Sequence, residues 1–332
     1  MKTYFVKDLT KGLVLNNETF AVKICENLQT KDGKPYYKLV LADKTGEIKA
    51  QIWSDNIKNV SKNSLKIGAV MMVDAMVEDY RGVLQLNILK AEKVEENKLN
   101  DYMESSDFDL EDLWKDLLKH IDSVKNENIK KFLTDFLNDS EIGPKFKIYP
   151  AAEFVHHAFR GGLLEHTVEM LDMTTPLRKY YKEANFDYIV AGIILHDSGK
   201  LLELEPVGLV TQRTKEGLLI GHLIKSYELL MQKGKGILNE EQMINLKHII
   251  LSHHGYLEFG SPILPSTIEA NIVTYVDQMS SKTRIFQKVI RQSQSNEMEF
   301  SEYDKIIGAK VYLGTNATQI DTPESHLPFE II

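Results

Sequence analysis

The chain has 332 residues, of which 43% are hydrophobic and 27% charged, a composition typical of a globular protein with room for two or more domains. No apolar run approaches the roughly 20 residues of a membrane-spanning helix, and the start MKTYFVKDLTKG lacks a signal-peptide core. We therefore predict a cytoplasmic protein with no membrane partner. The single cysteine, Cys25, excludes an intrachain disulfide.

The formal net charge of −8 argues against a surface coated with basic groups for duplex binding, but the charge is unevenly spread. Residues 1–95 hold 15 Lys and Arg and 12 Asp and Glu, a balance of +3, so the remainder carries −11. The first part of the chain is therefore the better candidate for contact with a phosphate backbone.

Hydrophobic and polar residues alternate from about Phe20 to Val94, as in PYYKLVLADKTGEIKAQIW and AVMMVDAMVEDYRGVLQLNIL. Turn residues at 44–46 and 81–82 predict hairpins, so at least five short strands fit a small barrel. The run LADKTGEIKAQIW, followed by a strand pair containing DYRGVLQL, resembles an OB-fold of the tRNA-anticodon-binding type. We assign residues 1–95 to an OB-fold domain that binds single-stranded nucleic acid.

Alternation with a period of two divides the second and third strands of this barrel into an interior and an outer set of side chains. OB-folds usually hold single strands on that outer face, where bases stack on aromatic rings beside cationic groups. The alternative is that the aromatic residues pack against the following domain. The interior set is Leu39, Leu41, Ile48, Ala50 and Ile52, and the outer set is Tyr36, Lys38, Lys49, Gln51 and Trp53.

Residues 96–150 begin with an acidic stretch that reads as a solvated linker, followed by the amphipathic runs LWKDLLKHI and IKKFLTDFL, which predict connecting helices. Residues 151–310 are helical in pattern nearly throughout, and residues 311–332 read as a loosely held tail. The predicted fold class is multidomain α and β, with an N-terminal five-stranded barrel followed by an all-α domain.

Five histidines and two aspartates follow one another through the helical region. Eight of the ten histidines lie between His156 and His254, a clustering that scattered surface histidines would not produce. Imidazole and carboxylate bind divalent transition metals, and the thiolates of a typical structural zinc site are absent from the pattern. The predicted metal ligands are His166, His196, Asp197, His222, His253, His254 and Asp277.

Neighbouring residues on a helix point about 100° apart, so an adjacent His-Asp pair does not chelate one ion comfortably. We expect Asp197 to bridge two ions, with His166, His196 and Asp277 completing one site. The other site is completed by His222, His253 and His254. Two cations roughly 4 Å apart can hold a hydroxide between them and neutralise a phosphate under attack.

Further residues near these ligands are candidates for substrate contact. In ILHDSGK the helix stops at Gly199, and Lys200 is expected to reach the scissile phosphate, with a solvated lysine as the alternative. Arg160 either clamps a phosphate or is solvated. His156 and His157 precede the first ligand and suit a substrate contact or the start of a helix, while His248 is expected to face elsewhere.

The segment ILHDSGK, with His166 upstream and Asp277 downstream, resembles the HD-domain superfamily of metal-dependent phosphohydrolases. The longer strings FVHHAFRGGLLEHTVEM, HDSGKLLEL, GHLIKS and SHHGYLEFGSPILPSTIEA resemble the YhaM family of 3′→5′ exoribonucleases over nearly the whole chain. The resemblance implies a manganese-dependent enzyme that removes nucleotides from the 3′ end of single-stranded RNA, and often of DNA. One departure is the run QMSSK after Asp277, which puts the surroundings of that ligand in doubt.

The predicted function is therefore a 3′→5′ exoribonuclease that releases 5′-mononucleotides, with Asp197 and Lys200 as its catalytic residues. The predicted cofactors are two divalent ions, Mn²⁺ first and Fe²⁺ or another transition metal as alternatives. Single-stranded RNA is the expected partner, and DNA as a further substrate and a homo-oligomer are left open. Two other functions remain: a cyclic-dinucleotide phosphodiesterase, and a non-catalytic single-strand-binding factor with a vestigial metal site.

Overall fold

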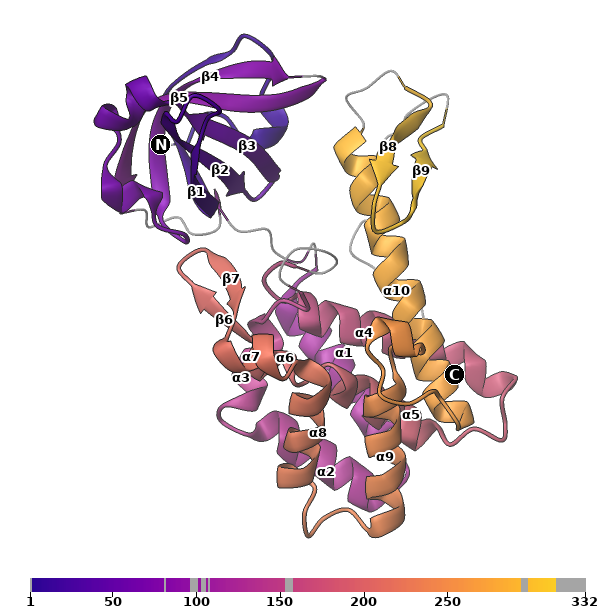
Figure 1. Cartoon of the computed structure of the whole chain (residues 1–332). Helices are drawn as coiled ribbons and strands as arrows, with labels where there is room; N and C mark the ends of the chain where they lie inside the picture. Colours follow the sequence, from indigo (N-terminus) through magenta and orange to yellow (C-terminus); the bar gives the residue numbers. More distant parts are fainter. Residues whose placement is uncertain are drawn as a thin grey trace. The chain divides into compact units, whose positions relative to one another are not determined.

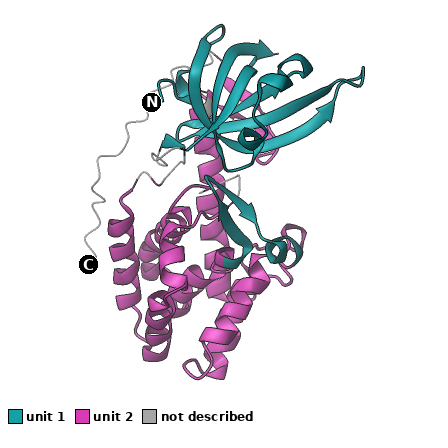
Figure 2. Ribbon diagram, turned by 90° about the vertical axis from the view of Figure 1, so that its left-hand side faces the viewer, with its two compact units in different colours: residues 1–105, 202–219 teal, residues 106–201, 220–332 magenta. Residues whose placement is uncertain are grey.

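The computed structural model describes residues 2–80, 82–95, 101–102, 106, 108–152, 158–293 and 298–314. The chain forms two compact units, shown in Figure 2 in different colours. Unit 1 comprises residues 1–105 and 202–219, and unit 2 comprises residues 106–201 and 220–332.

Unit 1 is built on a closed barrel with the strand order β1-β2-β3-β5-β4 (Figure 1). Neighbouring strands are antiparallel except β3 and β5, which run parallel. This five-stranded topology is that of an OB-fold, as the sequence predicts. The strands are β1 (Val14–Gln29), β2 (Pro35–Asp43), β3 (Gly46–Ile52), β4 (Val70–Tyr80) and β5 (Val83–Val94), with short 3-10 turns η1 (Val6–Asp8), η2 (Ser54–Asn59) and η3 (Lys62–Leu65).

The predicted alternation along β2 and β3 is confirmed. All five side chains of the interior set are at most 5% exposed and belong to one hydrophobic core. The register pairs Leu39 with Ala50 and Leu41 with Ile48, so residues that face each other across the two strands share the barrel interior. Their polar neighbours are consequently left on the outer face.

Unit 2 is helical, and its helices surround a second hydrophobic core. Helix α5 is almost entirely apolar and runs through this core, which explains why its sequence lacks a polar face. The elements are α1 (Leu110–Asp122), α2 (Glu127–Asn138), α3 (Ile142–Ile148), α4 (Gly162–Thr174), η5 (Thr175–Lys179), α5 (Phe186–His196), α6 (Lys200–Glu203), α8 (His222–Lys233), α9 (Glu240–Ser252), η6 (Leu257–Phe259), α10 (Ile268–Ser293), β8 (Phe300–Asp304) and β9 (Ala309–Tyr312).

In the region 96–150 the two predicted amphipathic runs form helices, but these helices do more than connect the two domains. Helices α1, α2 and α3 are present, but Leu117, Phe132 and Phe146 on them are fully buried in the same core as α4 and α5. Their amphipathic pattern therefore reflects packing against the later helices. At the other end, β9 includes the first two residues of the predicted tail, and residues 315–332 lie outside the described residues.

The segment Leu202–Leu219 lies between two parts of unit 2 in the sequence, but it belongs to unit 1 in the structure. It contains the hairpin of β6 (Leu204–Val207) and β7 (Val210–Arg213), followed by α7 (Lys215–Leu219). The backbones of Gly68 and Gly208 approach so closely that a Cβ atom on either would overlap backbone atoms of the other segment. Leu209 is buried in a small cluster with Ala21 and Val70 of the barrel. Removing residues 1–95 would therefore strip this hairpin of its packing.

None of the helices within the described ranges combines the length and the apolar character needed to cross a membrane.

Candidate metal centre

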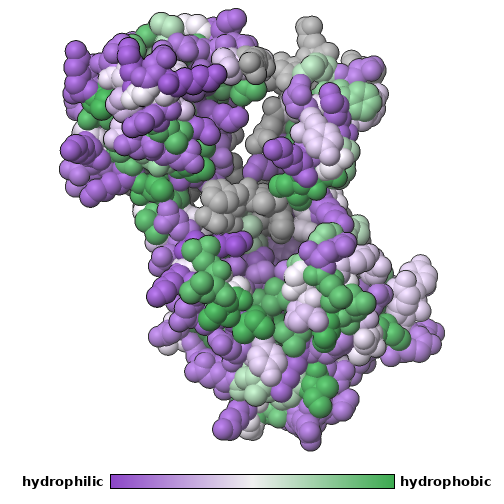
Figure 3. Space-filling model, viewed as in Figure 1, coloured by the Kyte–Doolittle hydropathy of each residue, from purple (hydrophilic) through white to green (hydrophobic). Residues whose placement is uncertain are grey.

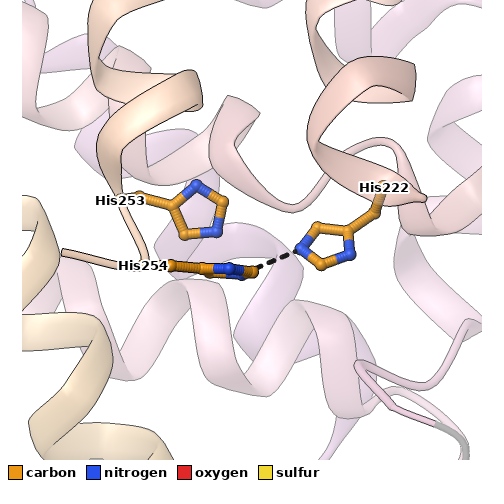
Figure 4. Close-up of side chains that lie close together, drawn as sticks. All are labelled: His222, His253 and His254. Atoms are coloured by element: carbon orange, nitrogen blue, oxygen red, sulfur yellow. Dashed lines mark hydrogen bonds between the residues drawn. The ribbon is translucent and has the colours of Figure 1, made fainter. Parts of the chain in front are cut away.

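Unit 2 brings all seven predicted ligand residues together, although they come from five helices or helix ends. His166 lies within α4, and Asp277 lies within α10. The others lie at helix ends: His196 and Asp197 at the end of α5, His222 at the start of α8, and His253 and His254 after α9. Figure 4 shows the imidazoles of His222, His253 and His254 turned toward one another.

Three overlapping groups of these side chains have ligand atoms within 4.8 Å of one another. The group His222, His253 and His254 is the set that we expected for one ion. Asp197 groups with His166 and His196, as a bridging carboxylate would, and Asp277 groups with His196, as expected, but also with His253. Asp277 also approaches His166, with 3.2 Å between Oδ1 and Nε2.

Asp197 occupies the middle of the cluster. Its Oδ1 lies 3.4 Å from His222 Nε2 and 3.9 Å from His253 Nε2, while its Oδ2 lies 3.4 Å from His196 Nε2 and 4.0 Å from His166 Nε2. The two carboxylate oxygens therefore face different histidines. This is the arrangement that a carboxylate shared between two cations requires, and it supports the bridging position that we propose for Asp197.

The tautomers of the histidines fit a metal centre. The Nδ1 atoms of His196, His253 and His254 donate to the backbone carbonyls of Ile193, Ile250 and Phe259 at 2.7–2.8 Å. A carbonyl oxygen only accepts, so in the neutral imidazoles the Nε2 atom carries a lone pair. For His196 this lone pair faces a carboxylate oxygen of Asp197 at 3.4 Å, and a proton or a cation between two such acceptors would stabilise the arrangement.

The electrostatics of the cluster also favour cation binding. Burial, followed by the charges of His196 and His254, holds the pKa of His253 well below its ordinary value, so its lone pair is available at neutral pH. Burial acts against ionisation of Asp197, but Lys200 and His196 outweigh it and keep the pKa of this carboxyl well below the usual range. Burial similarly opposes protonation of His196, yet Asp197 raises its pKa above the ordinary value. A metal ion can take the place of that proton.

The cluster is closed on one side and open on the other. His166, His196 and His253 are at most 1% exposed, whereas His222, His254 and Asp277 are partly exposed. Solvent therefore reaches the cluster from the side of the second group.

Lys200, the predicted phosphate-binding residue, lies at the cluster but contacts a carboxylate. Its Nζ donates to Asp197 Oδ2 at 2.6 Å, and the residue is only 8% exposed. The solvated lysine that we considered as the alternative is therefore not what the structure contains. The short turn after α5 places the ammonium here because Lys200 follows Asp197 by three residues.

Ser226 is a supporting residue that the sequence reasoning missed. Its hydroxyl donates to the carbonyl of His196 at 2.8 Å and accepts the backbone N–H of Gly199 at 2.7 Å. It therefore holds both ends of the turn that carries Asp197. A Cβ atom on Gly199 would overlap the carbonyl of His222, so only glycine fits between the turn and α8. The sequence held one signal for this role: Ser226 follows His222 by four residues, so the two side chains lie on the same face of one helix.

Ser280 is a second supporting residue, and it belongs to the unusual run QMSSK. It is fully buried, and its hydroxyl oxygen lies 3.0 Å from Nδ1 of His166. This contact orients the imidazole so that Nε2 faces the cluster. The run QMSSK therefore still supplies a hydrogen-bond partner for His166, the first of the predicted ligands.

Replacing Ser280 with alanine is expected to weaken divalent-metal binding by roughly 10- to 100-fold, the usual cost of losing the partner of a ligating histidine. Isothermal titration with Mn²⁺ measures this effect. The neighbouring variant Ser281→Ala is the control, because that hydroxyl contacts only a backbone carbonyl of its own helix among the hydrogen bonds of the described residues. Equal affinities for the two variants would show that Ser280 does not position the ligand.

The predicted nucleic-acid residues of the barrel lie on its outer face. The rings of Tyr36 and Trp53 stack with 5.3 Å between their centroids, and Trp53 is 39% exposed. Lys38 and Lys49 are exposed beside them, with Lys38 3.8 Å from Glu26, and Gln51 is partly buried.

The remaining candidates lie apart from the cluster or cannot be described. Arg160 is exposed, and its carbonyl accepts the N–H of Ser106. His248 accepts the backbone N–H of Ser266 at 2.9 Å, which agrees with the expectation that it faces elsewhere. His156 and His157 lie outside the described residues.

Comparison with known proteins adds to this geometry. Residues 163–282 match the family model of the HD domain. The chain is 31% identical over 297 residues to the 3′-5′ exoribonuclease YhaM of Geobacillus sp. (strain WCH70), covering 88% of this chain and 85% of that protein.

Two solved structures also resemble part of the chain. One is the second OB-fold domain of replication protein A from Methanococcus maripaludis, which is 20% identical in sequence. The match covers 28% of this chain and 96% of that chain, with a TM-score of 0.22. The other is the OB domain of a Methanosarcina mazei protein, which is 23% identical in sequence. The match covers 27% of this chain and 82% of that chain, with a TM-score of 0.23.

An OB-type barrel in the same chain as a helical HD domain, with histidines and aspartates gathered in that domain, defines a metal-dependent phosphohydrolase. The match to the Geobacillus protein extends over most of both chains and identifies the family within this class. The chain belongs to the YhaM family of 3′-5′ exoribonucleases.

Proposed function

We propose that this protein hydrolyses single-stranded RNA from its 3′ end and releases 5′-mononucleotides, with single-stranded DNA as a further substrate. The observation that carries the proposal is the convergence of five imidazoles and two carboxylates on one point of the helical domain. The relative named a 3′-5′ exoribonuclease supports the choice of polymer and direction. An OB barrel is suited to hold a single strand.

Two divalent ions are the proposed cofactors, Mn²⁺ before Fe²⁺, because imidazole and carboxylate ligands suit both metals. His222, His253 and His254 would hold one ion, and His166, His196 and Asp277 the other, with Asp197 shared between them. When bound, such a pair of ions activates water and neutralises the negative charge that develops on the phosphate.

The residues of the chain then have separate tasks in hydrolysis. Asp197 fixes the distance between the two halves of the cluster, because each of its oxygens faces a different pair of histidines. Lys200 lies within hydrogen-bonding distance of that carboxylate, so its ammonium is close enough to stabilise charge on a phosphate oxygen. The buried histidines exclude bulk water from the closed side, which strengthens these interactions.

The test is a digestion of 5′-labelled single-stranded RNA with Mn²⁺, with and without a chelator. We expect a ladder of labelled products shortened from the 3′ end and no reaction with the chelator, and chromatography of the unlabelled released species should show 5′-mononucleotides. A cyclic dinucleotide is assayed in parallel. Cleavage of the cyclic dinucleotide alone would indicate a phosphodiesterase, and binding of RNA without shortening would indicate a non-catalytic binding factor.

Replacing Trp53 with alanine is expected to weaken binding of single-stranded RNA by about 1–3 kcal/mol, the contribution of one stacked base. The physical reason is that the exposed ring of Trp53, stacked on the half-buried Tyr36, offers an aromatic surface to a base on the outer face of β2 and β3. Fluorescence anisotropy in a chelator-containing buffer measures the affinity without hydrolysis.

Two controls accompany this measurement. Trp53→Phe keeps an aromatic ring and should retain most of the affinity. Tyr180→Ala removes a ring that is 70% exposed on the helical unit and should have no effect. If all three variants bind as the unaltered protein does, the stack does not contact the strand.

A further inference from the structure

Two aromatic rings are exposed in the loop that follows the last histidine of the cluster. Tyr256 is 43% exposed and Phe259 is 55% exposed. Their rings form a T-shaped pair with 5.4 Å between centroids. The space-filling view shows that apolar side chains gather in patches on the helical unit (Figure 3). Apolar surface left open beside a functional site commonly marks the place of a ligand.

The loop that carries the two rings is held in a defined conformation. Gly255 and Gly260 have positive φ angles of 81° and 90°, which favour glycine and bracket the turn η6. The N–H groups of Phe259 and Ser261 both donate to the carbonyl of Tyr256, at 3.1 and 3.3 Å. A Cβ atom on Gly255 would lie 2.6 Å from Thr274 Cγ2, so the start of the loop packs tightly against α10. The rings are therefore positioned before any ligand arrives.

The same loop is bonded directly to the metal centre. The carbonyl of Phe259 accepts the Nδ1 proton of His254 at 2.8 Å. The opposite nitrogen of that imidazole, Nε2, lies 3.2 Å from Nε2 of His222, the contact drawn in Figure 4. Thus one residue both carries an exposed ring and orients a proposed ligand on the open side of the cluster. A substrate phosphate at the cluster would bring the attached nucleoside to this loop.

We propose that Tyr256 and Phe259 form the stacking site for the nucleobase at the 3′ end of the substrate. The inference rests on the proposed function and adds the residues that hold the terminal nucleotide. An exonuclease that degrades mixed sequences must accept every base in turn. Aromatic stacking meets this requirement because all bases present a π-face, whereas hydrogen bonds to base edges would select one base.

Leu257 provides a matched control. It lies in the same turn between the two aromatic residues and is 61% exposed, but it has no ring. The variants Tyr256→Leu and Phe259→Leu remove stacking while keeping an apolar side chain, and both leave the backbone carbonyl that His254 contacts. The variant Tyr256→Phe keeps the ring and tests whether the aromatic character is sufficient.

The experiment uses the full chain and single-stranded RNA with 2-aminopurine as its 3′-terminal base, in a buffer with chelator so that no cleavage occurs. Stacking on an aromatic ring quenches the fluorescence of this base. We expect quenching with the unaltered protein, Leu257→Ala and Tyr256→Phe, and loss of most quenching with Tyr256→Leu and Phe259→Leu. Affinity for the RNA should fall about tenfold in the two leucine variants.

Two results would overturn the stacking site: unchanged quenching in both leucine variants, or equal quenching when 2-aminopurine is placed at an internal position. The digestion with Mn²⁺ described above separates this inference from the proposed function. If the unaltered protein shortens RNA from the 3′ end while the leucine variants quench normally, only the stacking site is wrong. If the unaltered protein neither binds nor shortens RNA, the proposed function itself is wrong.

Discussion

Replacing Asp197 with asparagine is expected to lower hydrolysis of RNA by more than about 100-fold and to reduce the bound metal to one ion per chain or none. Asparagine has nearly the same shape but carries no charge and offers only one oxygen. In the structure each carboxylate oxygen of Asp197 faces a different pair of histidines, so both oxygens are needed to serve the two sites. Elemental analysis of the purified protein gives the metal content, and digestion of labelled RNA gives the activity.

The matched control for this variant is Asp172→Asn. Asp172 also accepts a contact from a histidine, with 2.9 Å between its Oδ1 and His120 Nε2, but this pair lies outside the metal cluster. The control should therefore retain metal and activity. Two bound ions and near-normal turnover in the Asp197 variant would rule out the bridging position.

Replacing Lys200 with methionine is expected to lower turnover by roughly 10²-fold, the scale of losing one electrostatic stabiliser of the transition state. Methionine matches the lysine side chain as far as Cε and lacks the ammonium. The metal content should stay unchanged, because an ammonium has no lone pair with which to bind a cation. Steady-state kinetics separates the cases: a contact made in the transition state lowers kcat, whereas a contact with the bound substrate alone raises KM.

The contact of Lys200 with Asp197 allows a second interpretation, in which the lysine merely neutralises a buried carboxylate. In that case its removal would lower stability or metal binding while kcat, measured at saturating metal, stays near normal. Lys233→Met is the control, because this lysine pairs with Asp139 on the same unit and outside the cluster. Thermal unfolding of both variants shows whether the loss of charge destabilises the fold.

The barrel was largely predictable because its physical signal is local. A strand that faces a core on one side alternates apolar and polar residues, and all five residues of the interior set on β2 and β3 are buried as this rule predicts. The close packing of Gly68 against Gly208 had no such signal, since the two glycines are far apart in sequence. The assignment of 202–219 to the barrel unit could not be predicted for the same reason.

The residues that gather in the candidate metal centre were also predictable, but the contacts among them were not. Histidines and aspartates in this order indicate a metal centre by their chemistry, and the structure brings all seven together. Which carboxylate faces which imidazole depends on the crossing of α4, α5 and α10. The expected pairing of Asp277 with His166 and His196 therefore became a wider set of contacts that also includes His253.

The sequence by itself determined the two kinds of domain, the inward face of the barrel strands and the seven residues of the candidate centre. These features follow from residue type and from periods of 2 and 3.6, which act over neighbouring residues. Only the tertiary structure decided that Ser226 and Ser280 support the centre, that Lys200 contacts Asp197, and that two exposed rings lie on the loop bonded to His254. Most of these contacts join segments that are distant along the chain, and such contacts depend on how whole helices pack, which no local pattern encodes.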